Sequence, residues 1–442
     1  MLNRFILLLA ISLCASAQQQ PTLQQILDRL EKLEQENKQL KTEVRQLREL
    51  LEGPVAPVAD VPKPSIEERL EVAEKRIDEQ AQTKVEASQK FPVQITGMAV
   101  ANLYAIMRHN NGADFSTSAG LLPSRMNSAL SIKQSVIGLK FNGPMTITGA
   151  RVSGNIFVDF FDGTIEGNAL PPRIRTGAID FDWTSSSLRF GYEKPIFSPR
   201  EPNSLATLGI SPLTGAGNLW RWQPQIRLEQ RFKMGEATDL KAQVGVMQTS
   251  EDLGSANALL VDRRRPAFQG RFQLSHQFGE GRRIEIATGF SSSQSHVRSI
   301  GASVPSRLIS VDWLVAPFSK LEWTGIFWSG ENIQHMGAFR NGLRVLPDNT
   351  AIPVHTQGGW TQFSVLPTDR VTLNFMAGIH DDRNSDLLRG QNARNRQGAA
   401  NIMFRLAPNV VLSFEAVNIK TLYLGLGNRV NQRYDLAIAY LF

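Results

Sequence analysis

The chain ends with the alternating stretch Tyr434-Asp435-Leu436-Ala437-Ile438-Ala439-Tyr440-Leu441-Phe442. Successive side chains of a β-strand point to opposite faces, so the large apolar residues at 434, 436, 438, 440 and 442 share one face. The other face carries Asp435 and small or aliphatic residues. The stretch therefore predicts a strand with one strongly apolar face.

The same alternation recurs upstream. Within 266–278, Phe268 and Phe272 oppose Gln269 and Arg271. Many of these segments reach about ten residues, near the roughly 9–11 that a tilted transmembrane strand needs, whereas strands of soluble proteins more often stop at about five or six. Sixteen candidate strands follow one another, near 92–107, 128–142, 145–161, 174–184, 187–194, 222–232, 238–249, 266–278, 282–293, 305–316, 319–329, 354–366, 370–380, 394–407, 409–420 and 429–442.

Short and long connections alternate strictly between these strands. Tight turns such as Asn142-Gly143-Pro144 and Gly279-Glu280-Gly281 alternate with long loops such as 195–221 and 330–353. Outer-membrane barrels show this asymmetry, with short periplasmic turns and long external loops. We therefore expect residues 91–442 to form an all-β transmembrane barrel of 16 antiparallel strands, with both of its ends in the periplasm.

Residues 1–17 have the pattern of a secretory signal peptide. Arg4 supplies the positive charge, an apolar core follows, and Ala15-Ser16-Ala17 fits the small-x-small cleavage rule. The only cysteine, Cys14, falls inside this segment, so the mature chain is expected to contain no disulfide. Beyond it there is no apolar run of the ~18 residues that a spanning helix needs.

Residues 22–52 follow a heptad repeat, which indicates a periplasmic α-helical coiled coil. A polar residue at one a position, Asn37, trades stability for register. An amphipathic helix docked on the barrel is the alternative. Residues 53–90 are expected to form a Pro-rich linker and a short second helix. The expected trimerisation contacts occupy the a and d positions, Leu23, Ile26, Leu30, Leu33, Asn37, Leu40, Val44, Leu47 and Leu51.

The basic charge of the chain lies in the barrel. The formal net charge is +7, and residues 91–442 hold 35 Lys and Arg against 26 Asp and Glu, with only seven lysines among the 35. The export signal argues against nucleic acid as the partner. A lumen suited to anions explains the excess better. Alternatively, lumen arginines could pair with lumen acids and brace the wall, and external ones such as Arg263, Arg264 and Arg265 could bind lipopolysaccharide phosphates.

The terminal strand, with Tyr440 and Phe442, resembles the signal that bacterial outer-membrane proteins present to their barrel-assembly machinery. With its signal peptide, coiled coil, basic barrel and the run from Gly217-Asn218-Leu219-Trp220-Arg221 through Trp222 to Arg227, the chain resembles the DcaP-like porins and, more distantly, the phosphate-selective porins. The resemblance implies a homotrimeric outer-membrane channel for small anionic solutes, dicarboxylate- or phosphate-like. The small number of barrel lysines departs from the lysine-rich pore of a strict phosphate channel.

The third long loop is the expected constriction, because in porins this loop typically folds inward and narrows the pore. Here it is 195–221, so Arg200, Glu201, Asn203 and Arg221 are candidates. A loop that packs over the rim or a neighbouring subunit is the alternative. Arginines of the wall expected in the same anion filter are Arg189, Arg227, Arg231, Arg271 and Arg370. Aromatic residues expected in the interfacial girdles are Trp183, Tyr192, Trp313, Trp323, Trp360, Tyr423, Tyr434 and Tyr440.

Catalytic chemistry has little support in the sequence. The six histidines are scattered without metal-ligand spacing, and there is no Gly-x-Ser-x-Gly elbow or phosphate-binding loop. We expect no enzyme, no cofactor and no metal site. The alternative function is an outer-membrane-anchored envelope tether or adhesin with a closed barrel, in which the lumen would be filled by bulky side chains.

Overall fold

The computed structural model describes residues 93–110, 116–161, 170–206, 210–248, 261–262, 266–338 and 341–442. The expected signal peptide of 1–17, the coiled coil of 22–52 and the segment 53–90 lie outside these residues, as do Arg263, Arg264 and Arg265. Those assignments stay predictions. Within the described ranges, no helix is both long and apolar enough to cross a bilayer.

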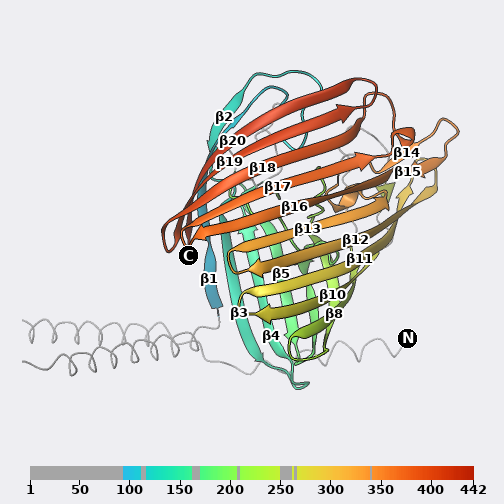
Figure 1. The fold of residues 1–442 in the computed structure, drawn as a ribbon. Helices are drawn as coiled ribbons and strands as arrows, with labels where there is room; N and C mark the ends of the chain where they lie inside the picture. The colour runs from blue at the N-terminus through green and yellow to red at the C-terminus, as the bar shows by residue number, and fades with distance from the viewer. Residues whose placement is uncertain are drawn as a thin grey trace, which may run out of the picture. The chain divides into compact units, whose positions relative to one another are not determined.

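The described residues form long antiparallel strands that wrap around a common axis (Figure 1). The strands are β1 (Val93–Ile106), β2 (Asn127–Ser131), β3 (Val136–Met145), β4 (Arg151–Asp159), β5 (Arg173–Asp182), β6 (Ser186–Glu193), β7 (Gln223–Lys233), β8 (Thr238–Met247), β9 (Val261–Asp262), β10 (Ala267–Gly279), β11 (Arg282–Val297), β12 (Ala302–Phe318), β13 (Leu321–Glu331), β14 (Leu343–Val345), β15 (Ala351–Pro353), β16 (His355–Thr368), β17 (Val371–Asp382), β18 (Asn392–Ala407), β19 (Val410–Tyr423) and β20 (Gly427–Leu441).

The sheet closes on itself, since β1 pairs with β20 on one side and with β2 and β3 on the other. Two of the 18 segments in this sheet only continue a neighbour: β2 and β3 lie end to end along β1, and β9 extends β10 along β11. The ring therefore has the sixteen strands predicted from the sequence. At the closure, Gly97 and Phe442 exchange two backbone hydrogen bonds of 2.9 and 3.1 Å.

The two faces of the sheet differ as the alternation predicts. On β10, Phe272 and Leu274 are both 48% exposed, whereas Arg271 and Gln273, which alternate with them, are 1% and 7% exposed. The apolar side chains therefore lie on the outer surface and the polar ones on the inner surface. Two of the residues expected in the girdles do not follow this arrangement: Trp360 and Tyr423 are buried and face inward, because segments inside the barrel cover them.

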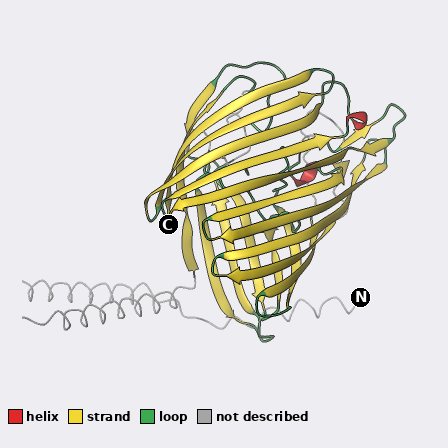
Figure 2. Ribbon diagram, in the orientation of Figure 1, coloured by secondary structure: helices red, strands yellow, loops and turns green. Residues whose placement is uncertain are grey.

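Short turns lie at one end of the barrel and the long connections lie at the other (Figure 2). Two of the long connections contain the short 3-10 helices η1 (Gln334–Met336) and η2 (Asn384–Asp386). We call these ends the short-turn rim and the long-loop rim. The third predicted strand, 145–161, starts later than expected, at Arg151. The chain turns at 146–150 instead, where Gly149 adopts a left-handed φ of 76° and the Thr146 N–H donates to the Ala150 carbonyl at 2.8 Å.

Candidate functional site

The connection between β6 and β7, loop 195–221, is described at 195–206 and 210–221, and these parts lie inside the barrel against the inner wall. Its first part is held by β10 and β12: the Ile196 N–H donates to Gln269 Oε1 at 3.0 Å, and Ser310 Oγ donates to the Phe197 carbonyl at 3.4 Å. Glycine permits the close approach, because a Cβ on Gly289 would lie 2.6 Å from the Cβ of Phe197. The sequence left open whether this loop folds inward, and the described residues show that it does.

The middle of the loop continues along the same wall. The Asn203 N–H donates to Gln362 Oε1 of β16 at 2.7 Å, and Asn401 Nδ2 of β18 donates to the Asn203 carbonyl at 2.8 Å. Arg433 Nη2 of β20 donates to the Ala206 carbonyl at 2.5 Å. Strands β10 to β20 are neighbours around the ring, so the loop follows about half of the inner circumference.

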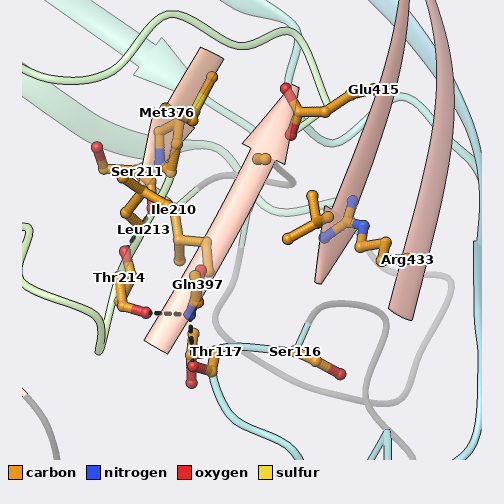
Figure 3. A pocket seen from close by; sticks show the side chains of 13 residues that line it. Ser116, Thr117, Ile210, Ser211, Leu213, Thr214, Met376, Gln397, Glu415 and Arg433 are labelled. Carbon is orange, nitrogen blue, oxygen red and sulfur yellow. Dashed lines mark hydrogen bonds between the residues drawn. The ribbon is translucent and has the colours of Figure 1, made fainter. Parts of the chain in front are cut away.

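The returning part of the loop stays on this side. Gln397 Nε2 lies between the carbonyls of Thr117 and Thr214, at 2.7 and 3.0 Å (Figure 3). Glu415 and Arg433 lie across a cavity of about 40 Å³ from it, enough for a water molecule or two. A dry cluster joins the loop to β12–β17; its members are Phe197, Leu213, Leu219, Leu308, Ile326, Trp328, Ile333, Met336, Trp360 and Met376.

The strongest attachment of the loop is ionic. Arg200 donates to Asp312 Oδ1 of β12 at 2.5 Å and also binds Glu285 of β11. Arg271 of β10 donates twice to the Asp312 carboxylate, each time at 2.8 Å. Two cations and two anions thus form one cluster, in which Arg271 and Asp312 are each 1% exposed. Removing one partner of such a cluster leaves a buried charge uncompensated.

The opposite half of the inner wall, β3–β8, remains partly exposed and polar. Its side chains include Lys140, Asn155, Arg189, Arg227, Glu229 and Lys241. Ion pairs occupy several of these groups. Arg189 donates to both oxygens of Asp180 at 2.5 and 2.9 Å, and Glu229 accepts from Arg231 at 3.2 Å. The inner wall of β3–β8 is therefore a polar surface that carries charges of both signs.

Arg227 differs from its neighbours. It lies directly opposite Arg189 in the pairing of β6 with β7, and its neighbour on β8 is Gly245, which contributes no side chain. Among the described residues, Arg227 makes no ion pair and no hydrogen bond through its side chain, because the nearby carboxylates already bind Arg189 and Arg231. Within the described part of the chain, its guanidinium charge is therefore not neutralised by a bound carboxylate.

The nine residues predicted for the filter fall into separate groups. Arg189, Arg227 and Arg231 lie together on β6 and β7. Arg200 and Arg271 meet at Asp312, and Glu201 pairs with Lys194 at 2.9 Å. Asn203 and Arg221 hold the loop through their backbones, Arg221 by donating to the Met336 carbonyl at 3.4 Å. Arg370 lies apart from the loop, exposed in a turn at the short-turn rim.

Sequence reasoning missed Asp312 and Lys241. Asp312 is a single acid within the otherwise apolar or small run Leu308-Ile309-Ser310-Val311-Asp312-Trp313-Leu314. An acid at an inward position of such a strand is a signal for a buried ion pair. On β8, Lys241 alternates with the apolar residues Leu240 and Ala242, so the period of two alone could have placed its side chain on the inner, polar face.

The fold has counterparts among solved structures, although no protein-family model and no curated protein matches the chain. The outer-membrane channel DcaP of Acinetobacter baumannii superposes with a TM-score of 0.65 at 16% identity, over 79% of this chain and 97% of that one. An anion-selective porin from Comamonas acidovorans gives a TM-score of 0.51 at 11% identity, over 79% and 99%. OprB of Pseudomonas putida gives 0.50 at 10%, over 82% and 97%. The chain therefore has the fold of the DcaP-like outer-membrane porins, which confirms at the level of the fold the resemblance found in its sequence.

Proposed function

We propose that the protein is an outer-membrane porin for the passive diffusion of small anionic solutes, dicarboxylate- or phosphate-like. The observation that supports this most is the internal loop 195–221, which lines one half of the lumen and leaves the polar wall of β3–β8 facing it. Solutes would pass between the two, with the short-turn rim in the periplasm.

Anion preference would rest on Arg227. Arginine stays charged at any working pH and its planar fork matches a carboxylate or a phosphate. Because carboxylates already bind Arg200 and Arg271, these two residues are assigned to fixing the loop rather than to the filter. Arg189 and Arg231 would add to the local potential through their exposed edges.

The test is conductance in planar bilayers with reversal potentials measured in a potassium chloride gradient. Arg227→Glu should lower the chloride-to-potassium preference about thirtyfold, since it changes the local charge by two units and each unit charge a few Å away in water is worth about 1 kcal/mol. Arg307→Glu makes the same charge change on the outer surface, where Arg307 is exposed, and should leave the preference unchanged. Equal shifts in both variants would remove Arg227 from the filter.

A second candidate function, an envelope tether or adhesin with a closed barrel, is favoured by the dry cluster that fills the interior beside β12–β17. The same bilayer experiment decides between the two. Wild-type protein that inserts but carries no current would contradict the porin and support the tether.

We also propose a homotrimer. Lipid-facing barrel surfaces carry aromatic residues near both interfaces. Among the described residues, the exposed aromatic side chains lie on β6 and later strands, whereas β1–β5 present aliphatic ones such as Ile95, Leu103 and Leu130. An outer face poor in exposed aromatic residues, on which Phe141 and Phe181 are only partly exposed, suits contact with another copy of the chain. The predicted coiled coil would assist this association from the periplasm.

A further inference from the structure

Two cations face each other on the outer surface of the barrel. Arg396 of β18 is directly opposite Lys420 of β19, and both are exposed on the face that also carries Ile402 and Phe414. Neither makes an ion pair or a side-chain hydrogen bond with any described residue. Like charges directly opposite each other on a sheet are destabilising unless an anion compensates them.

Other outward charges at this level are already paired. Arg394 donates to Asp381 twice, each time at 2.8 Å, and Arg307 lies 3.9 Å from Glu331. The pair Arg396–Lys420 is thus a local excess of positive charge rather than part of a general ion-pair network. Both residues lie within a few positions of the long-loop rim, since β18 begins at Asn392 and β19 ends at Tyr423.

The register places an apolar groove beside this pair. Phe327, Gly359, Ile379, Arg396, Lys420 and Val430 form one row across β13–β20. The next row toward the short-turn rim consists of small or neutral residues, Gly325, Thr361, Ala377, Gly398, Asn418 and Gln432. The resulting groove has a volume of about 560 Å³, and its lining includes Trp313 and Phe327 together with Arg396 and Lys420.

The floor of the groove is open. A Cβ on Gly398 would meet nothing within 4 Å, so glycine there leaves empty space on the outer surface. The next row toward the short-turn rim contains the aromatic residues Trp323, Phe363 and Phe375. Trp323 stacks on Phe363 with ring centroids 5.7 Å apart. The groove is therefore bounded by cations on the side of the long loops and by aromatic rings on the side of the bilayer centre.

We propose that this groove binds a phosphate-bearing lipid of the external leaflet. The phosphate would lie between Arg396 and Lys420, and an acyl chain would lie along Gly398, Ala377 and Gly359. Basic residues at a membrane surface attract anionic headgroups, and an apolar groove beside them selects a lipid over a free anion. This assignment rests on the outer-membrane location in the proposed function. The aromatic rows around the groove favour lipid over a second copy of the chain.

The test uses the full-length protein purified in a neutral detergent and native mass spectrometry with bisphosphorylated lipid A, with phosphatidylethanolamine as the zwitterionic comparison. The double variant Arg396→Ala/Lys420→Ala should weaken lipid A binding roughly thirtyfold, given about 1 kcal/mol for each basic residue near a membrane surface. Gly398→Phe, which fills the groove without changing charge, should weaken binding as well.

The matched control is Lys320→Ala/Arg405→Ala, which removes two exposed cations at the short-turn rim and should bind lipid A as the wild type does. Unchanged binding by the Arg396/Lys420 variant or by Gly398→Phe would overturn the proposal. So would loss of the oligomer in the Arg396/Lys420 variant with lipid binding intact, because this face would then be a subunit contact. Conductance of the same preparations is a separate readout, so an absent channel and an absent lipid site give different results.

Discussion

At the scale of single residues, two arginines on the inner face, Arg227 of β7 and Arg271 of β10 on either side of β8, have different surroundings. Arg271 is buried with its guanidinium on Asp312, and it reaches β12 across β11 because Ala287 and Gly289 leave room between them. Arg227 is only partly buried and has no carboxylate partner among the described residues. The residue type is the same, and the distance to a carboxylate decides whether the charge joins a buried ion pair or stays without a bound carboxylate.

This difference predicts opposite effects of the same substitution. Arg271→Ala should destabilise the barrel by about 3 to 5 kcal/mol, the usual loss when one partner of a buried pair is removed. Arg227→Ala should change stability by less than about 1 kcal/mol. The measurement is urea-induced unfolding in detergent or lipid, followed by tryptophan fluorescence. Equal losses in the two variants would contradict the assignment of Arg271 to a structural pair.

Sequence reasoning could place Arg271 and Arg227 on the inner face, because alternation fixes the face of each residue. It could not find Asp312 as the partner of Arg271 and Arg200. That contact joins β10 to β12 and to a loop more than a hundred residues away, and it depends on the register of two strand pairs and on small residues in the strand between. The chemistry of a lumen is therefore less predictable than its polarity.

At the scale of elements, the position of loop 195–221 depends on glycines in the wall. Gly289→Val should push the loop away from β11, because the new Cβ would lie 2.6 Å from the Cβ of Phe197. We expect a changed single-channel conductance and larger current fluctuations in planar bilayers. Gly398→Val, a substitution into open space on the outer surface, should leave conductance as in the wild type. An unaltered current in Gly289→Val would show that the loop does not narrow the pore.

The stability of the folded segment around η1 should depend on pH. His335 is 2% exposed, and burial, with a smaller effect of the nearby Arg221 charge, lowers its pKa from the usual 6.5 to about 4. The unfolded segment therefore binds a proton at a higher pH than the folded one. Stability should fall as the pH drops from about 6.5 to about 4, by up to about 3 kcal/mol, and should not change through this group above that range.

Hydrogen exchange of residues 332–338 and 219–222, corrected for the intrinsic pH dependence of exchange, measures this effect. Protection should decrease on acidification in the wild type, because Met336 accepts the Arg221 N–H and both segments pack in the same cluster. His335→Gln cannot titrate and should keep its protection. A similar acid response in both proteins would assign the change to other groups.

The elements themselves could be predicted closely, for a physical reason. In a barrel each strand lies between lipid and a polar interior, so period two persists along its length and every strand end is marked by a turn or a loop. The exceptions are places where tertiary contacts intervene. The expected strand 128–142 is interrupted at 132–135, where Ser135 Oγ binds the backbone of Val100, and Trp360 and Tyr423 are covered by internal segments that periodicity cannot reveal.

At the scale of the whole molecule, the barrel and the predicted coiled coil should separate functionally. The barrel closes through its own hydrogen bonds from Gly97 to Phe442, so deletion of 22–52 should leave a folded, conducting barrel. The trimer should become weaker, because the heptad contacts from Leu23 to Leu51 would be lost. Sedimentation of the detergent-solubilised protein at decreasing concentration measures this, and a deletion variant as trimeric as the full chain would assign association to the barrel alone.

Asn37→Leu gives the sharper test, because it alters one a position and nothing in the barrel. A buried polar residue at a lowers the stability of a coiled coil while restricting its register and number of strands. The variant should therefore resist dissociation better than the wild type and should populate more than one oligomeric state. Gln35→Leu, at an outward position of the same heptad, is the control and should keep both the wild-type stability and a single state. If Asn37→Leu leaves both properties unchanged, residues 22–52 do not associate with their copies, and a helix docked on the barrel becomes the better description of this segment.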